Sequence, residues 1–352
     1  MSLLLSPATP FLSVFAIFLA SLLIVLSAAA WFTRRLEALC DRLDLSAGML
    51  SILSALGANI PNYVASIVAI ANGQQDVGLG IIIGSNMYNL AIILGLSALV
   101  APGSHGIRLR LKEKHDVLII AYYAFAITLT TLLAIWLLLR TPIVVPASAQ
   151  LLTLVPLILA LILTCAIFSS FVYHIVKRPH PSYTRSLDKQ EVSRSRTYPG
   201  SLMRLIAEVL FALVIALAGV IVMVQSGEQL TADVHMPAAL AGLLVLAVAT
   251  SLPNTVVAVI LVRTGRMAAC VEEIFSSNSI NATLGIALPL LLWRALLQDH
   301  LLLALDGPCI ILLTLGIIVC IRMSRLNRII GLCLLLSYAV WVVIHLLLNV
   351  RV

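Results

Sequence analysis

Two polar segments that recur at one constant offset, 192 residues, constrain this chain more than any other feature of its sequence. Asn-Ile-Pro-Asn at 59–62 aligns with Ser-Leu-Pro-Asn at 251–254, and Ser-Asn-Met-Tyr-Asn at 85–89 aligns with Ser-Asn-Ser-Ile-Asn at 277–281. Both copies interrupt apolar sequence, and each contains a proline, which breaks or bends a helix. In a membrane, such duplicated polar clusters are typical of transporters built from internal repeats, with the site where the repeats meet.

The composition places the chain in a membrane. Hydrophobic residues make up 61% of it, charged residues only 11%, and the mean hydropathy is +1.11. A helix that crosses a hydrocarbon core of about 30 Å needs roughly 20 apolar residues. Ten segments meet this requirement, approximately 9–31, 46–71, 77–101, 116–139, 147–175, 202–224, 237–262, 268–294, 299–321 and 328–349.

Basic residues predict how the chain is oriented. All but three of the 22 Lys and Arg residues lie in or beside loops that follow odd-numbered spans, and the exceptions are Arg140, Arg294 and Arg351. The positive-inside rule makes those loops cytoplasmic and places both termini outside. The spans with Pro61 and Pro253 then run in opposite directions. We therefore expect an all-α membrane protein of ten transmembrane helices in two inverted five-helix repeats, residues 1–175 and 202–352, joined by a cytoplasmic linker at 176–201.

Other classes of function find no support in the sequence. The net charge of +7 is spread over short loops that face anionic lipid, so the lipid bilayer and not a nucleic acid is the expected partner. The six cysteines show no metal-ligand spacing, and no motif for a cofactor or an intramembrane protease occurs in the spans. The chain is thus predicted to be an integral protein of the cell (inner or plasma) membrane, without enzymatic activity or cofactor.

The polar residues of each motif are suited to hold an ion. They are spaced three or four apart, so they share a helix face, and each proline should free backbone carbonyl oxygens one turn earlier. A single Ser or Asn in a membrane helix is usually a packing contact, but packing would not require the same residues at the same offset in both halves. We predict a substrate site at the bilayer midplane, formed by Asn59, Asn62, Ser85, Asn89, Ser251, Asn254, Ser277 and Asn281.

These motifs resemble the two α-repeats of the sodium/calcium exchanger (cation/calcium antiporter, CaCA) superfamily. The resemblance covers nearly the whole chain and implies five plus five inverted helices, of which the first and sixth slide against the other eight. The chain departs from the family where an acidic residue normally follows each motif proline, because Asn62 and Asn254 stand there; Asn59 also replaces a usual serine. The family's binding positions that match are Ser85, Asn89, Thr250, Ser251 and Ser277, and Asn281 stands where Asn or Asp is found.

The loss of both acidic residues predicts a change of ion. Calcium sites use six to eight oxygens and normally several carboxylates, and a divalent ion without counter-charge is costly to desolvate. We therefore expect a secondary active cation antiporter with monovalent-leaning selectivity, for which sodium, a proton or calcium is the transported cation. The alternative is a transport-inactive relative that acts as a regulatory or partner membrane subunit.

Glu273 is the carboxylate best placed to supply charge or to act as a gate. It lies four residues before Ser277, on the same helix face, about one turn nearer the cytoplasm. The alternative is that Glu272 and Glu273 are interfacial residues that pair with Arg263 and Arg266 at the start of the helix.

Overall fold

The computed structural model describes residues 10–43, 47–103, 106–140, 147–177, 201–263, 265–293 and 300–349, and helices account for nearly all of them. The predicted linker at 176–201 lies almost wholly outside these residues. Within them, nine helical segments are long and apolar enough to cross a membrane. They are Phe11–Leu36, Gln75–Val100, Leu111–Arg140, Leu154–Val176, Leu202–Asp233, Ala241–Arg263, Met267–Leu292, Leu301–Arg322 and Arg328–Leu348.

The predicted span 46–71 is divided into two short helices. The first, α2 (Ala47–Ala58), ends just before Asn59, and α3 (Ile60–Ala71) begins just after it. Pro61 lies in the first turn of α3, where its missing N–H costs no hydrogen bond. The carbonyl oxygen of Asn59 accepts hydrogen bonds from the backbone N–H groups of Asn62 (3.0 Å) and Tyr63 (3.2 Å), which starts the new helix. The span that contains Pro61 is therefore broken at its proline motif, as a proline in a helix can cause.

Three other spans contain π-helical segments in place of breaks. A π-turn widens the helix and leaves backbone groups less completely bonded, and such turns are frequent at functional sites. Two of the three begin at the last residue of a Ser-Asn motif, at Asn89 and at Asn281. The spans are α4 (Gln75–Tyr88), η1 (Asn89–Ile93) and α5 (Leu94–Val100); η4 (Ala241–Leu246) and α10 (Ala247–Arg263); and α11 (Met267–Ile280), η5 (Asn281–Ala287) and α12 (Leu288–Leu292).

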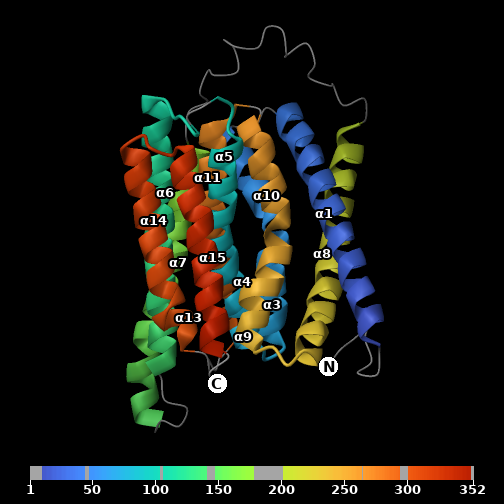
Figure 1. The fold of residues 1–352 in the computed structure, drawn as a ribbon, viewed down its shortest axis with the longest axis vertical. Coiled ribbons are helices and arrows are strands. Elements are labelled where there is room, and N and C mark those ends of the chain that lie inside the picture. Colours follow the sequence, from blue (N-terminus) through green and yellow to red (C-terminus); the bar gives the residue numbers. More distant parts are fainter. Residues whose placement is uncertain are drawn as a thin grey trace.

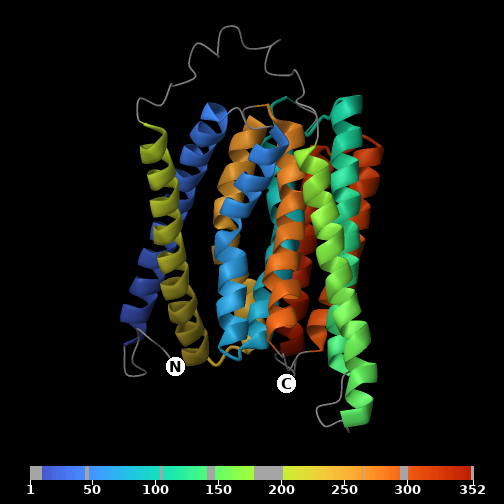
Figure 2. The same cartoon turned by 180° about the vertical axis from the view of Figure 1, so that it is seen from behind.

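Two long helices pack against each other and stand at one side of the bundle (Figure 1), as the view from behind also shows (Figure 2). They are α1 (Phe11–Arg42) and α8 (Leu202–Asp233). An ion pair between Arg35 and Glu208, 2.7 Å apart, joins them near one end. The rest of the molecule comprises the spans described above with α6 (Leu111–Arg140), α7 (Ala147–Val176), α9 (Ala238–Leu240), α13 (Leu301–Ala304), α14 (Asp306–Arg322) and α15 (Arg328–Asn349).

A buried carboxylate joins the last two spans. Asp306, at the start of α14, is fully buried, and its Oδ1 accepts a hydrogen bond from Trp341 Nε1 of α15 at 2.7 Å. The same oxygen lies 2.7 Å from His345 Nε2, one turn further along α15. The contacts of Trp341 and His345 with this carboxylate therefore join α14 to α15.

The motif-bearing helices α4 and α11 form the centre of the bundle. Every residue of α4 from Val77 to Tyr88 is buried, as is every residue of α11 from Glu273 to Ile280. Glycines let the backbone of α4 approach that of η4 and its flanking residues: a Cβ atom built on Gly80 would lie 3.2 Å from Leu243 N of η4 and 2.8 Å from Ala239 O of α9, and one on Gly84 would lie 2.7 Å from Ala247 Cβ of α10. Such close contacts between small residues are a common basis of helix packing in membranes.

The close approach at Gly84 can be tested with a single methyl group. Gly84→Ala should destabilise the protein by about 1–3 kcal/mol, because the new Cβ would overlap Ala247 and the carbonyl of Leu243. Gly316→Ala in α14 is the matched control, since a Cβ there meets nothing within 4 Å. It should raise stability by roughly 0.5–1 kcal/mol through helix propensity alone. Thermal unfolding in detergent measures both, and equal shifts would contradict the packing described.

Candidate functional site

All nine residues that the sequence predicts for the site are buried in the structure. Each has 0% of its surface exposed, a result that isolated polar residues on lipid-facing or solvent-facing surfaces would not give. They come from the α2–α3 break, from α4 and η1, from α10, and from α11 and η5. They are Asn59, Asn62, Ser85, Asn89, Thr250, Ser251, Asn254, Ser277 and Asn281.

Five side chains from both halves of the chain form a first polar cluster. Asn59 is at its centre: its Oδ1 accepts hydrogen bonds from Asn62 Nδ2 (3.1 Å) and Asn254 Nδ2 (2.7 Å). Its own Nδ2 donates to Ser277 Oγ at 2.7 Å, and Ser277 Oγ donates to Glu273 Oε1 at 2.8 Å. The first polar cluster thus joins the proline motifs of both halves to α11.

Glu273 belongs to this cluster and not to the membrane surface. Its exposed fraction is 3%, and its carboxylate is bonded to Ser277 inside the bundle. None of the ion pairs shown by the described residues joins Glu273 to Arg263 or Arg266. The structure therefore disagrees with the interfacial alternative for this residue, and a buried carboxylate reaches the predicted site.

Four asparagines form a second polar cluster, which relates the two halves symmetrically. Asn86 Nδ2 donates to the backbone oxygen of Asn278 (3.4 Å), and Asn278 Nδ2 donates to that of Asn86 (3.3 Å). Asn89 Nδ2 donates to Asn278 Oδ1 (2.9 Å), while Asn281 Nδ2 donates to Asn86 Oδ1 (3.1 Å). Each bond has its counterpart at an offset of 192 residues. We call these four hydrogen bonds the clamp. It holds α4 against α11 at the point where each helix continues into its π-helical segment.

The sequence did not single out Asn86 and Asn278 as site residues. Both stand in the repeated Ser-Asn motifs, at the same offset as the predicted residues, so the signal was present. The predicted face joins residues four apart, beginning at each serine, and Asn86 and Asn278 lie off that face. In the structure they orient the two asparagines of that face.

The remaining predicted residues are close to backbone carbonyls of η4 and α10. Thr250 Oγ1 donates to Leu246 O (2.7 Å) and Ala247 O (3.2 Å), and Ser85 Oγ donates to the same Ala247 carbonyl at 3.5 Å. Ser251 Oγ has no hydrogen-bond partner among the described residues. These three hydroxyls are therefore buried beside the clusters but are not bonded to the amides.

Several buried oxygens of the clusters accept no hydrogen bond from the described residues. Oxygen ligands without competing nitrogen or sulfur suit hard cations. No group of three or more His, Cys, Asp and Glu that could hold a metal occurs in the described part of the chain. The oxygens are Oδ1 of Asn62, Asn89, Asn254 and Asn281, Oγ of Ser251 and Oε2 of Glu273.

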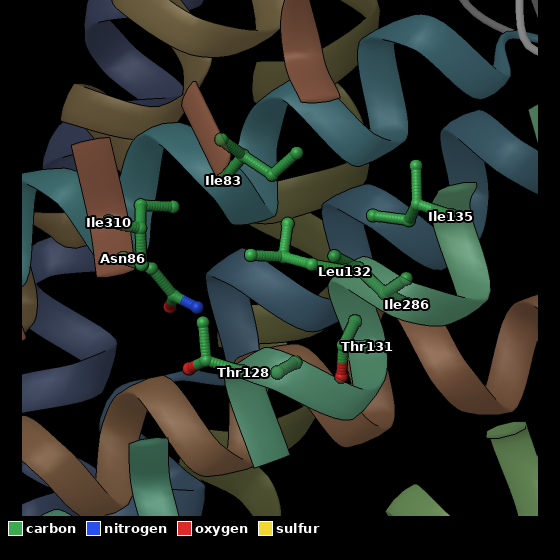
Figure 3. A pocket seen from close by; sticks show the side chains of 9 residues that line it. Ile83, Asn86, Thr128, Thr131, Leu132, Ile135, Ile286 and Ile310 are labelled. Carbon is green, nitrogen blue, oxygen red and sulfur yellow. The ribbon is translucent and has the colours of Figure 1, made fainter. Parts of the chain in front are cut away.

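A small cavity of about 10 Å³ lies on the α6 side of the second polar cluster. Figure 3 shows Asn86 beside Thr128 of α6, with Thr131 further along the same helix, amid isoleucine and leucine side chains. A cavity of this volume has room for about one water molecule. It is thus large enough for a solvent molecule at the clamp and too small for a larger solute.

Solved structures of a membrane exchanger share this architecture. A structure of the sodium-calcium exchanger NCX_Mj, soaked with sodium and without calcium, aligns with 95% of this chain and 99% of its own, with a TM-score of 0.65 at 17% identity. At this identity the likeness defines the fold, and it confirms the predicted all-α membrane architecture.

The family follows from the sequence comparison. The sequence model of the sodium/calcium exchanger protein family matches residues 13–175 and 204–347, so the chain belongs to that family and is an integral membrane protein of a transporter class, not an enzyme. The sodium/calcium exchanger MaX1 of Methanosarcina acetivorans is 26% identical over 115 residues, 32% of this chain and 33% of that protein. The inner membrane protein YrbG of Escherichia coli is 38% identical over 60 residues, 17% of this chain and 18% of that protein. The matched segments thus span a third or less of these relatives.

The clamp of the second polar cluster can be tested by its non-additivity. Asn86→Ala and Asn278→Ala should each lower stability by about 1–2 kcal/mol, because each leaves buried donors and acceptors of the other half without partners. The double variant should lose less than the sum, since the two side chains share their bonds. Ser279→Ala is the control, because its hydroxyl bonds only Phe275 O of its own helix, at 2.9 Å. Strict additivity in detergent unfolding would contradict the clamp.

Proposed function

We propose that this protein is a secondary active cation antiporter that binds its ion between the first and second polar clusters, at the bilayer midplane. The observation that carries the proposal is the set of buried side-chain oxygens, from both halves of the chain, that accept no hydrogen bond from the described residues. Buried polar groups within a membrane are costly, and where they converge they usually serve transport. Membership of the sodium/calcium exchanger family supports the same conclusion.

The selectivity that we propose leans toward monovalent cations such as sodium. Asn62 and Asn254 are neutral, and Glu273 is the one acidic side chain hydrogen-bonded to the clusters in the described chain. A single carboxylate balances one positive charge. A calcium ion would keep an excess charge in a medium of low dielectric constant, where uncompensated charge is costly. Calcium is then the less favoured substrate, whereas a proton, like sodium, carries only the single charge that Glu273 can balance.

The transport cycle that we propose uses the two halves of the chain, residues 1–175 and 202–352. α1 and α8, which stand beside the rest of the bundle, are the helices that slide, so that the site opens alternately to either side.

The connector at 176–201 lies in the cytoplasm and both termini lie outside, because basic residues gather on the connector's side. YrbG is described as an inner membrane protein, and we propose a cell membrane for this chain as well.

The second candidate is a transport-inactive relative that serves as a membrane subunit. Such a protein would have no reason to keep nine fully buried polar residues in its predicted site, because each polar side chain in a membrane interior reduces stability unless it is bonded. The oxygens without hydrogen bonds favour the working antiporter.

The ion selectivity is tested by restoring the two charges. Asn62→Glu with Asn254→Glu should strengthen calcium binding on the order of a hundredfold, because two carboxylates return to a buried site. A single replacement should give a partial effect. Calorimetric titration with calcium, together with sodium-driven calcium flux into liposomes, measures the change.

The control for this experiment separates charge from length. Asn62→Gln with Asn254→Gln lengthens both side chains equally without adding charge, and it should not strengthen calcium binding. Tight calcium binding by the wild type, unaffected by the glutamates, would show that the charge comes from elsewhere.

The role of Glu273 is tested by removing its charge. Glu273→Gln keeps an oxygen that accepts from Ser277 but should lower the apparent affinity for sodium about tenfold, as expected for the loss of a close charge in a buried site. Glu272→Gln is the matched control, since Glu272 points about 100° away from Glu273 around the helix and is partly exposed. Sodium flux measured with reconstituted variants decides, and equal results for the two would count against Glu273 as part of the site.

A further inference from the structure

Asn59 is fully engaged by protein partners. A side-chain amide offers two N–H donors and two oxygen lone pairs. The Asn59 nitrogen donates to Ser277 Oγ and to Ala55 O, both at 2.7 Å, and its oxygen accepts from Asn62 and Asn254. No lone pair of Asn59 remains to bind a cation.

The orientation of the Asn59 amide is fixed by its backbone contact. The carbonyl of Ala55 can only accept a hydrogen bond, so the atom of Asn59 that faces it at 2.7 Å must be the nitrogen. The oxygen must then point the other way, toward the amides of Asn62 and Asn254. Since an oxygen can only accept, both of those side chains must present their nitrogens to Asn59.

This orientation leaves the oxygens of Asn62 and Asn254 on the side of each amide that faces away from Asn59. With their nitrogens bonded to Asn59, Asn62 and Asn254 have their Oδ1 atoms left, and neither oxygen has a hydrogen-bond partner among the described residues. A carboxylate needs no such help, because both of its outer atoms are oxygens. An amide can bind a cation only when its oxygen, and not its nitrogen, faces the ion.

We propose that Asn59 is a positioning residue that turns the oxygens of Asn62 and Asn254 toward the ion, and so lets two neutral amides act as cation ligands. The inference rests on the proposed function, in that Asn62 and Asn254 bind a cation. It changes the role predicted for Asn59 from ligand to orienting group. One asparagine does this for both halves of the chain, since the residue at the equivalent position, Ser251, makes no hydrogen bond to a described residue through its hydroxyl.

The test compares Asn59→Ala in two backgrounds. In the wild-type background it should weaken sodium binding about tenfold or more, because the two amides lose the contact that orients them. In the Asn62→Asp/Asn254→Asp background it should weaken binding less than about threefold or even strengthen it, because aspartate has no nitrogen to turn away and the Asn59 oxygen then faces like charge. Apparent Kd values for sodium chloride, against choline chloride at equal ionic strength, come from the sodium dependence of thermal unfolding of the purified protein.

Two further variants keep the test decisive. Ser251→Ala, the equivalent change in the other half, should alter the Kd by the same factor in both backgrounds. Asn59→Asp retains an acceptor for both amides but sets an oxygen against the carbonyl of Ala55, so it should weaken sodium binding less than Asn59→Ala does. An equal loss from Asn59→Ala in both backgrounds, or a loss in Asn59→Asp as large as in Asn59→Ala, would overturn the positioning role alone. Absence of sodium, potassium and lithium binding by the wild type would instead overturn the proposed function, and the inference with it.

Discussion

A polar group at the centre of a bilayer must find its partner inside the protein, because lipid offers none. In this chain side-chain amides meet that requirement, and amides have two unlike ends. When the nitrogen of an amide makes a hydrogen bond, the oxygen of the same amide must point the other way. The orientation of one side chain therefore determines which atom the next side chain must present to it. The backbone carbonyls of Ala55, Asn86 and Asn278 begin these chains of contacts, since they can only accept. The arrangement of helices and the chemistry of the site both depend on this constraint.

The two clusters use the constraint differently. The second polar cluster is symmetric: each of its four hydrogen bonds has a counterpart in the other half. The first is not, because Asn59 has a serine as its counterpart and Glu273 has Ile81. A duplicated framework therefore carries an asymmetric centre. A symmetric contact can hold two equivalent helices together. A cluster with a single carboxylate cannot be symmetric, because only one half of the chain supplies that group.

The sequence predicted the helical spans and the burial of nine polar residues. Polar residues that interrupt apolar spans at the same offset in both halves are expected to lie inside the bundle, near the bilayer centre. The proline motifs predicted a break or bend in both halves, but the sequence did not show that the first copy breaks its span at Asn59 while the second lies within α10. Asn86 and Asn278 lie off the predicted face, which joins residues four apart, and their bonds to the other half exist only in the folded chain. The depth of Glu273 was ambiguous because its span, 26 residues long, exceeds what a bilayer needs. Hydrogen-bond direction, which decides what an asparagine can bind, is a property of three-dimensional contacts.

The close contact between α4 and η4 has a mechanical consequence. Where Gly80 and Gly84 face Gly242 and its neighbours, backbone touches backbone with no side chain between. Because no side chain at this contact can change its rotamer, the two helices cannot shift slightly past each other by side-chain rearrangement. They either keep this contact or separate. Ser85 and Asn86 follow Gly84 directly, and Ala247, with which Ser85 shares a hydrogen bond, lies against it. This contact therefore fixes the distance between Ser85 in the first half of the chain and the start of α10 in the second half.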